Sequence, residues 1–192
     1  MTMSASAAIT TAFPGDPTFV LYQQTAQNPC VIGASNCNNP GGFGVTTLAS
    51  GSASSYDALS PLYTASQITA LVGNTFGLGL DLNNTSANQT VSLVEMLVNG
   101  SVVQFWNTGF TGTATNNGSG YSDIDFFGWS LVGVLPTATV QFHLVMPTAN
   151  DGAESLFLVT GTSVNSVPEP SSMALIGTGL AGLGFLARRR RK

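Results

Sequence analysis

Residues 91–106 read VSLVEMLVNGSVVQFW, and these two apolar runs on either side of one Asn-Gly pair decide the expected fold. Valine and the aromatic residues favour extended backbone, and Asn99-Gly100 readily takes the two positive φ angles of a type I′ turn. The sequence therefore predicts a β-hairpin with strands at 91–98 and 101–106.

The rest of the chain, up to residue 160, has the same character. Alternation of apolar and polar residues over 76–83 and 139–146 predicts strands with one buried face. We also expect strands at 18–24, at 44–48, within 121–134 and at 156–160, and a short helix at 63–72. Roughly eight short strands between Asn-, Gly- and Ser-rich loops indicate an all-β chain, folded as a β-sandwich or jelly roll over 9–162.

Charged residues are scarce and unevenly placed along the 192 residues. All five Lys and Arg residues fall in 188–192, so 1–187 hold all nine acids, and His143 is the only possible cation there. Because Lys and Arg neutralise phosphates, their absence excludes nucleic-acid binding and a phosphate-cradling cofactor site. His143 is interpreted as a surface residue, and with no G-x-S-x-G motif we expect no enzyme.

The C-terminal stretch contains three consecutive signals. A linker over 163–172 holds Val167, Pro168, Glu169 and Pro170, and an uncharged segment follows at 173–187. As a helix that segment would be about 22 Å long, which is short for a bilayer core of roughly 30 Å. The chain ends in a basic cluster of Arg188, Arg189, Arg190, Arg191 and Lys192. A short transmembrane helix with a cytoplasmic basic tail would leave the body outside the cytoplasm.

This tail resembles the PEP-CTERM sorting signal through Pro168-Glu169-Pro170, the apolar segment 173–187 and the basic cluster 188–192. The resemblance implies recognition by an exosortase, a membrane-embedded transpeptidase-like enzyme of Gram-negative bacteria. It implies export, anchoring in the inner membrane through the C-terminal helix, and cleavage near the motif, followed by release or attachment at the cell surface. It also implies a link to exopolysaccharide and biofilm.

Residues 1–8 lack the basic and apolar parts of a signal peptide, but Ala5-Ser6-Ala7 matches an A-x-A cleavage site. We interpret 1–8 as the remnant of a signal peptide whose translation start lies upstream. An exported chain meets an oxidising compartment, where Cys30 and Cys37 would close a short disulfide loop worth roughly 2–3 kcal/mol. Two free thiols are the alternative.

Acidic and amide side chains around residues 116–125 suggest a Ca²⁺ site. Oxygen ligands on Gly-permitted turns suit this ion, so Asn117, Asp123 and Asp125 are candidate ligands, joined by Asp81 from another strand end. Glu154 lies in a similar position near a strand end. The alternative is that these residues only form turns.

Trp106 is a candidate sugar-stacking residue, because it ends a strand beside a loop. The alternative is that the aromatic residues form the core. Together these features predict an exported, non-catalytic structural or adhesive protein linked to exopolysaccharide. A carbohydrate-binding module, dependent on calcium or not, is the second hypothesis.

Overall fold

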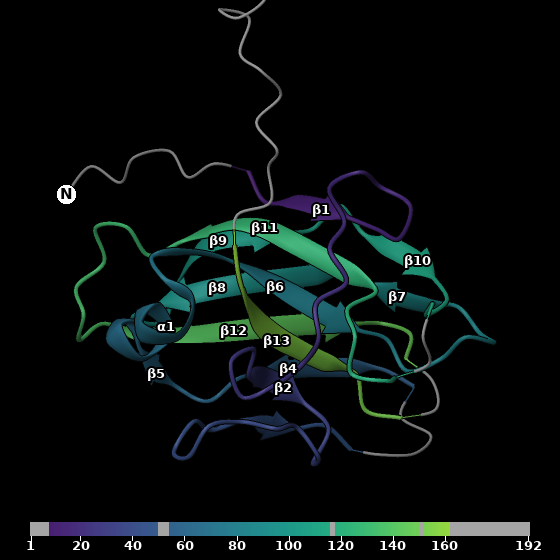
Figure 1. Ribbon diagram of the computed structural model, residues 1–192, viewed down its shortest axis with the longest axis horizontal. Helices are drawn as coiled ribbons and strands as arrows, with labels where there is room; N and C mark the ends of the chain where they lie inside the picture. Colours follow the sequence, from purple (N-terminus) through teal and green to yellow (C-terminus); the bar gives the residue numbers. More distant parts are fainter. Residues whose placement is uncertain (1–7, 50–53, 116–117, 150–151, 162–192) are drawn as a thin grey trace, which may run out of the picture.

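The computed structural model describes residues 8–49, 54–115, 118–149 and 152–161, and it confirms the all-β class (Figure 1). In chain order the elements are β1 (Thr10–Ala12), β2 (Cys30–Gly33), β3 (Thr46–Thr47), β4 (Tyr56–Leu59), β5 (Tyr63–Thr64), α1 (Ala65–Val72), β6 (Thr75–Asp81), β7 (Gln89–Val91), β8 (Leu93–Val98), β9 (Ser101–Trp106), β10 (Phe110–Gly112), β11 (Ile124–Ser130), β12 (Thr139–Met146) and β13 (Ser155–Thr160).

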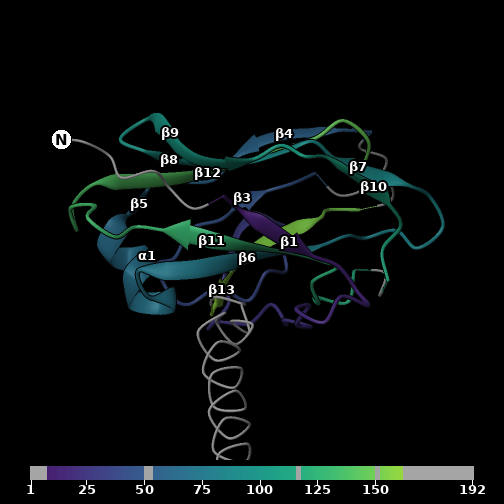
Figure 2. The ribbon, with the colours of Figure 1, turned by 90° about the horizontal axis from the view of Figure 1, so that it is seen from above.

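The strands form two layers that face each other (Figure 2). One layer has the order β1-β11-β6-β13-β2-β3 and the other has β4-β12-β8-β9, with β5 paired to β12 and a separate ribbon of β10 and β7. The apolar core lies between the layers, where the rings of Phe76 and Phe142 meet edge to face at 6.2 Å. All pairings between these strands are antiparallel except that of β2 with β3.

The predicted hairpin forms from β8 and β9. Asn99 and Gly100 have φ angles of 50° and 77°, as a type I′ turn requires. The pairing places Glu95 opposite Phe105, and β8 in turn pairs with β12. Strand β12 has the predicted bounds, because its apolar residues alternate strictly with polar ones and every second residue is buried.

The centre of the six-stranded layer is buried on both faces. A Cβ on Gly77 would lie 2.7 Å from Val159 Cγ2, and one on Gly79 would lie 2.7 Å from the Phe157 ring. These glycines therefore allow β13 side chains to pack directly on the β6 backbone. The outer face is covered further by the segment 18–24, whose Tyr22 ring lies 6.3 Å from Phe127.

Two expectations for the N-terminal part were wrong. Residues 18–24 form no strand but only an isolated bridge between Gln23 and Tyr121, because the segment crosses the outer face of the sheet. Strand β2 was missed because all four of its residues are buried, so no alternation marks it.

The single described helix, α1, begins with a capping box. The Gln67 amide donates to Thr64 Oγ1 at 3.2 Å, and the Thr64 amide donates to Gln67 Oε1 at 2.8 Å. The helix starts two residues later than predicted because Tyr63 and Thr64 form β5. Among the described residues, none of the helical structure is long and apolar enough to cross a bilayer.

Candidate functional site

Three carboxylates meet at one end of the six-stranded layer, and we call them the acid cluster: Asp81, Asp123 and Glu154. Asp81 ends β6, whereas Asp123 and Glu154 each directly precede a strand that is antiparallel to β6. Sheet register therefore brings together residues far apart in sequence. All three are at most 5% exposed.

Neutral N–H groups hold these carboxylates. Asp123 Oδ2 accepts from the Leu82 amide at 2.9 Å, and its Oδ1 accepts from the Thr115 amide at 2.5 Å. Glu154 Oε2 accepts from the Asn83 amide at 2.5 Å, and its Oε1 accepts from the side-chain amide of Gln89. Asp81 Oδ2 accepts from the Gly120 amide at 2.9 Å.

Burial raises the pKa of two members of the cluster. The pKa of Asp81 rises to about 7, against the opposing hydrogen bond from Gly120 and with a further increase from the charge of Asp123. The pKa of Glu154 rises to about 8, where the hydrogen bonds from Asn83 and Gln89 oppose burial. Asp81 Oδ1 and Gln89 Oε1 are buried and have no hydrogen-bond partner among the described residues. The cluster therefore binds protons close to neutral pH.

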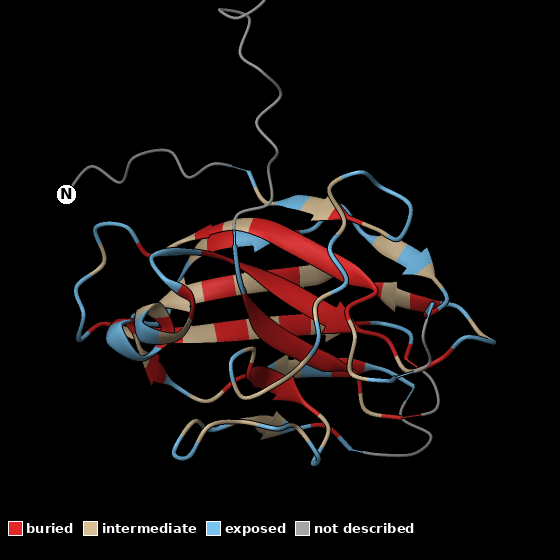
Figure 3. Cartoon of the chain, viewed as in Figure 1, coloured by how far each residue is buried: buried red, intermediate tan, exposed pale blue. Residues whose placement is uncertain are grey.

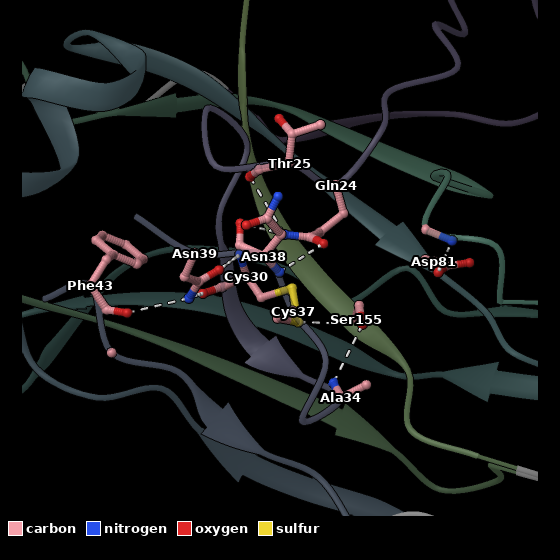
Figure 4. Close-up of a disulfide and its surroundings, with 12 residues drawn as sticks. Gln24, Thr25, Cys30, Ala34, Cys37, Asn38, Asn39, Phe43, Asp81 and Ser155 are labelled. Carbon is pink, nitrogen blue, oxygen red and sulfur yellow. Dashed lines mark hydrogen bonds between the residues drawn. A yellow bond between two sulfur atoms is a disulfide. The ribbon is translucent and has the colours of Figure 1, made fainter. Parts of the chain in front are cut away.

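A polar depression of about 580 Å³ lies beside the cluster, between Asp81 and the disulfide loop (Figure 4). Cys30 and Cys37 are joined by a disulfide with an S–S distance of 2.08 Å. Ser155 Oγ lies 3.8 Å from Cys37 Sγ, and the Ala34 amide donates to the same hydroxyl at 3.5 Å. The wall is completed by Gln24, Ser35, Asn36, Asn83, Gly118, Ser119, Gly120, Gly152 and Ala153.

The predicted calcium ligands are only partly brought together. Asp81 and Asp123 lie in the acid cluster with Glu154, whereas Asp125 lies under the segment 18–24 and accepts from the Val20 amide at 3.1 Å. Burial raises the pKa of Asp125 to about 6, against hydrogen bonds from Ser122 and Val20. Asn117 falls outside the described residues.

In the described part of the chain, no three His, Cys, Asp or Glu side chains are arranged to hold a metal ion. The calcium site stays a prediction. Thermal unfolding with and without roughly millimolar Ca²⁺ tests it, and an unchanged midpoint would contradict it.

The expectation of an exposed Trp106 ring was wrong. Its side chain is 4% exposed and meets Phe126 edge to face at 5.0 Å in the core. Alternation along β9 turns Gln104 and Trp106 inward, so the exposed aromatic residue of this strand is Phe105, at 54%.

A second polar group, which we call the His143 group, lies on the outer face of the five-stranded layer. His143 Nε2 lies 2.7 Å from Asp57 Oδ1, and Nδ1 lies 3.0 Å from Glu95 Oε2. Burial lowers the pKa of His143, but the hydrogen bonds and charges of Asp57 and Glu95 outweigh it and leave the pKa raised. The sequence placed His143 on the surface, but its two acidic partners come from β4 and β8, which only the sheet register reveals.

The comparisons bear on the tail alone. The model of the PEP-CTERM protein-sorting motif matches residues 166–191, which include the predicted motif residues Val167 to Pro170 and the arginines 188–191. No curated protein and no solved structure matches the chain. The predicted linker 163–172, helix 173–187 and basic tail 188–192, like residues 1–7, lie outside the described residues. The motif marks an exosortase target that is exported and anchored in the membrane before processing.

Proposed function

We propose that this PEP-CTERM protein, once processed by an exosortase, has a non-catalytic structural or adhesive role at the cell surface or in the extracellular matrix. The observation that carries the proposal is the sorting motif at residues 166–191. The Cys30–Cys37 disulfide supports a destination in an oxidising compartment.

The environment of the carboxylates supports a non-catalytic role. Asp123 and Glu154 have both oxygens engaged by N–H donors and are almost fully buried. Both ring nitrogens of His143 are engaged by Asp57 and Glu95. A general acid or base needs access to its substrate, which neither arrangement provides.

Binding of a carbohydrate such as exopolysaccharide is the second candidate function, and one row of side chains favours it. Strand register aligns Leu59, His143, Glu95 and Phe105 across β4, β12, β8 and β9. Leu59 is 46% exposed and Phe105 is 54% exposed, with the polar pair between them. An apolar ring can stack on a sugar face while carboxylate and imidazole groups bond its hydroxyls.

Substitution of the motif tests the sorting proposal. In a host with an exosortase, Pro168→Ala/Glu169→Ala/Pro170→Ala should retain the full-length chain in the membrane and abolish its shortened surface form. Ser171→Ala/Ser172→Ala, at neighbouring positions, is the matched control. Immunoblots of membrane, surface and medium fractions measure the result. Normal processing of the triple variant would contradict the assignment.

A glycan array tests the second candidate. Phe105→Ser should remove binding, whereas Val20→Ser, at a residue 44% exposed on the other layer, should leave it intact. Failure of the unaltered protein to retain any glycan, including the host's own exopolysaccharide, would eliminate this candidate and leave the structural role.

A further inference from the structure

The end of the body opposite the acid cluster carries no charged side chain. Three connecting segments form it, and we call residues 60–75, 98–102 and 130–139 the uncharged end, because none contains Asp, Glu, Lys, Arg or His. Backbone hydrogen bonds join the segments: Ala65 N to Ala138 O (2.9 Å), Ser66 N to Pro136 O (3.0 Å), Leu131 N to Asn74 O (2.8 Å) and Asn99 N to Thr139 O (2.9 Å).

The uncharged end also exposes large apolar side chains. Val132 is 71% exposed, and Leu62 and Leu135 are each 65% exposed, more than any other large apolar residue described. The loop beside α1 that holds Val132 and Leu135 is largely pale blue in Figure 3. Exposed apolar side chains that gather at one place on a monomer indicate an interaction surface.

The chain leaves the body at this same end. The last residue of β13, Thr160, pairs with Phe76 near the start of β6, and the neighbouring Thr75 pairs with Ser130 at the edge of the uncharged end. Residues 162–172 separate the described body from the apolar segment at 173–187. Eleven residues reach at most about 40 Å, so an anchored body is held close to the bilayer.

We propose that the uncharged end docks on the lipid bilayer in which the tail is anchored, with Leu62, Val132 and Leu135 at the lipid interface. This docking rests on the proposed function, because the sorting tail supplies the anchor. Apolar side chains favour the boundary between headgroups and acyl chains. Electrostatics favours the same orientation: an anionic bilayer repels acids, and the acid cluster lies at the far end of β6, further away than a Debye length of about 8–10 Å.

Photochemical labelling from the lipid side tests this orientation. The full chain is reconstituted in phosphatidylethanolamine/phosphatidylglycerol vesicles that contain a diazirine-bearing phospholipid, floated on a density gradient and illuminated. Chymotryptic peptides are then mapped by mass spectrometry, since the body has no Lys or Arg for trypsin. Peptides covering 60–64 and 130–136 should carry the label, and peptides covering 83–89 and 118–123 should not.

A matched pair of variants sharpens the test. Leu62→Ser/Val132→Ser/Leu135→Ser should reduce labelling about fivefold or more, while Leu59→Ser/Phe105→Ser, at exposed positions on the other layer, should leave it unchanged. Unchanged midpoints of thermal unfolding in both variants would show that the fold is intact.

The outcomes separate the two proposals. A chain that does not float with the vesicles would lack the anchor, and both proposals would fall. A chain that floats but is labelled equally at its two ends, or regardless of the triple substitution, would overturn the docking alone. Cross-links between two copies through Leu62 and Leu135 would overturn it in favour of self-association.

Discussion

The acid cluster and the His143 group place carboxylates in two different ways within a body that has no Lys or Arg. In the cluster, Asp81, Asp123 and Glu154 are buried, and amide N–H groups and bound protons hold them. In the His143 group, Asp57 is 79% exposed, and water and one imidazole hold it.

The difference shows what a buried carboxylate needs when no cation is present. An isolated buried negative charge is costly, so the group either receives several N–H bonds or takes up a proton. Water and one imidazole suffice at the surface, where the charges are screened and their interactions are weak. Substitutions in the cluster should therefore change stability far more than equivalent ones around His143.

Removal of a carboxylate from the cluster should have the largest effect. Asp123→Ala would leave the amides of Leu82 and Thr115 without their acceptor, at a cost of roughly 2–4 kcal/mol in the free energy of unfolding. Asp57→Ala, the matched control, should cost under about 1 kcal/mol. Urea unfolding measures both, and equal losses would erase the contrast between the two sites.

The pH dependence of stability comes next in size. Folding raises the pKa of Asp125 to about 6, of Asp81 to about 7 and of Glu154 to about 8, so the folded state binds more protons than the unfolded chain. The resulting stability is fully present below the unfolded pKa values near 4 and is lost as pH rises through 6–8. The unfolding midpoint should fall by about 5 °C or more between pH 5 and pH 8.5. A midpoint that rises over this interval in calorimetry would refute the expectation.

A neutral replacement of one cluster member should isolate its share of that slope. Glu154→Gln keeps an oxygen for the Asn83 amide, and Gln89 can turn its unpartnered Oε1 toward the new side-chain amide. We expect a change within about 1 kcal/mol at pH 5 and a smaller loss of stability between pH 7 and 8.5 than in the unaltered protein. Glu95→Gln serves as the surface control, and an unaltered slope in Glu154→Gln would assign the proton uptake elsewhere.

The smallest effect is expected at His143. Because its pKa is raised, its ion pairs contribute fully below pH 6.5 and are lost as pH rises through the folded value. His143→Gln should cost about 0.5–1 kcal/mol at pH 5.5 and close to nothing at pH 9. A double-mutant cycle with Asp57→Asn at both pH values measures the coupling. Coupling that persists at pH 9 would show a neutral hydrogen bond instead.

The sequence predicted the fold where its pattern was local. Strict alternation gave β12, and Asn99-Gly100 gave the hairpin between β8 and β9. Strand β2 carries no alternation because the sheet and the covering segment bury both of its faces. The apolar residues of 18–24 look like a strand in sequence but lie across the sheet.

The sites depend on register, which a single sequence does not reveal. Asp81 and Glu154 are neighbours only because β13 pairs with β6, although the acids near these strand ends were visible in the sequence. Trp106 was assigned to the wrong side of its strand because a place beside a loop says nothing about which face is buried. For His143, the sequence showed a polar face on its strand but not the carboxylates on the two neighbouring strands.

The position of β13 determines when the body can fold during export. It is the last strand in the chain, yet it lies in the middle of its sheet, between β6 and β2. Until residue 160 has crossed the inner membrane, β6 and β2 lack their shared neighbour, and the layer stays in two parts. The sorting motif begins at residue 166, only a few residues later. Translocation, closure of the sheet and arrival of the exosortase signal thus fall in immediate succession, so the enzyme first meets a chain whose body has only just become able to fold.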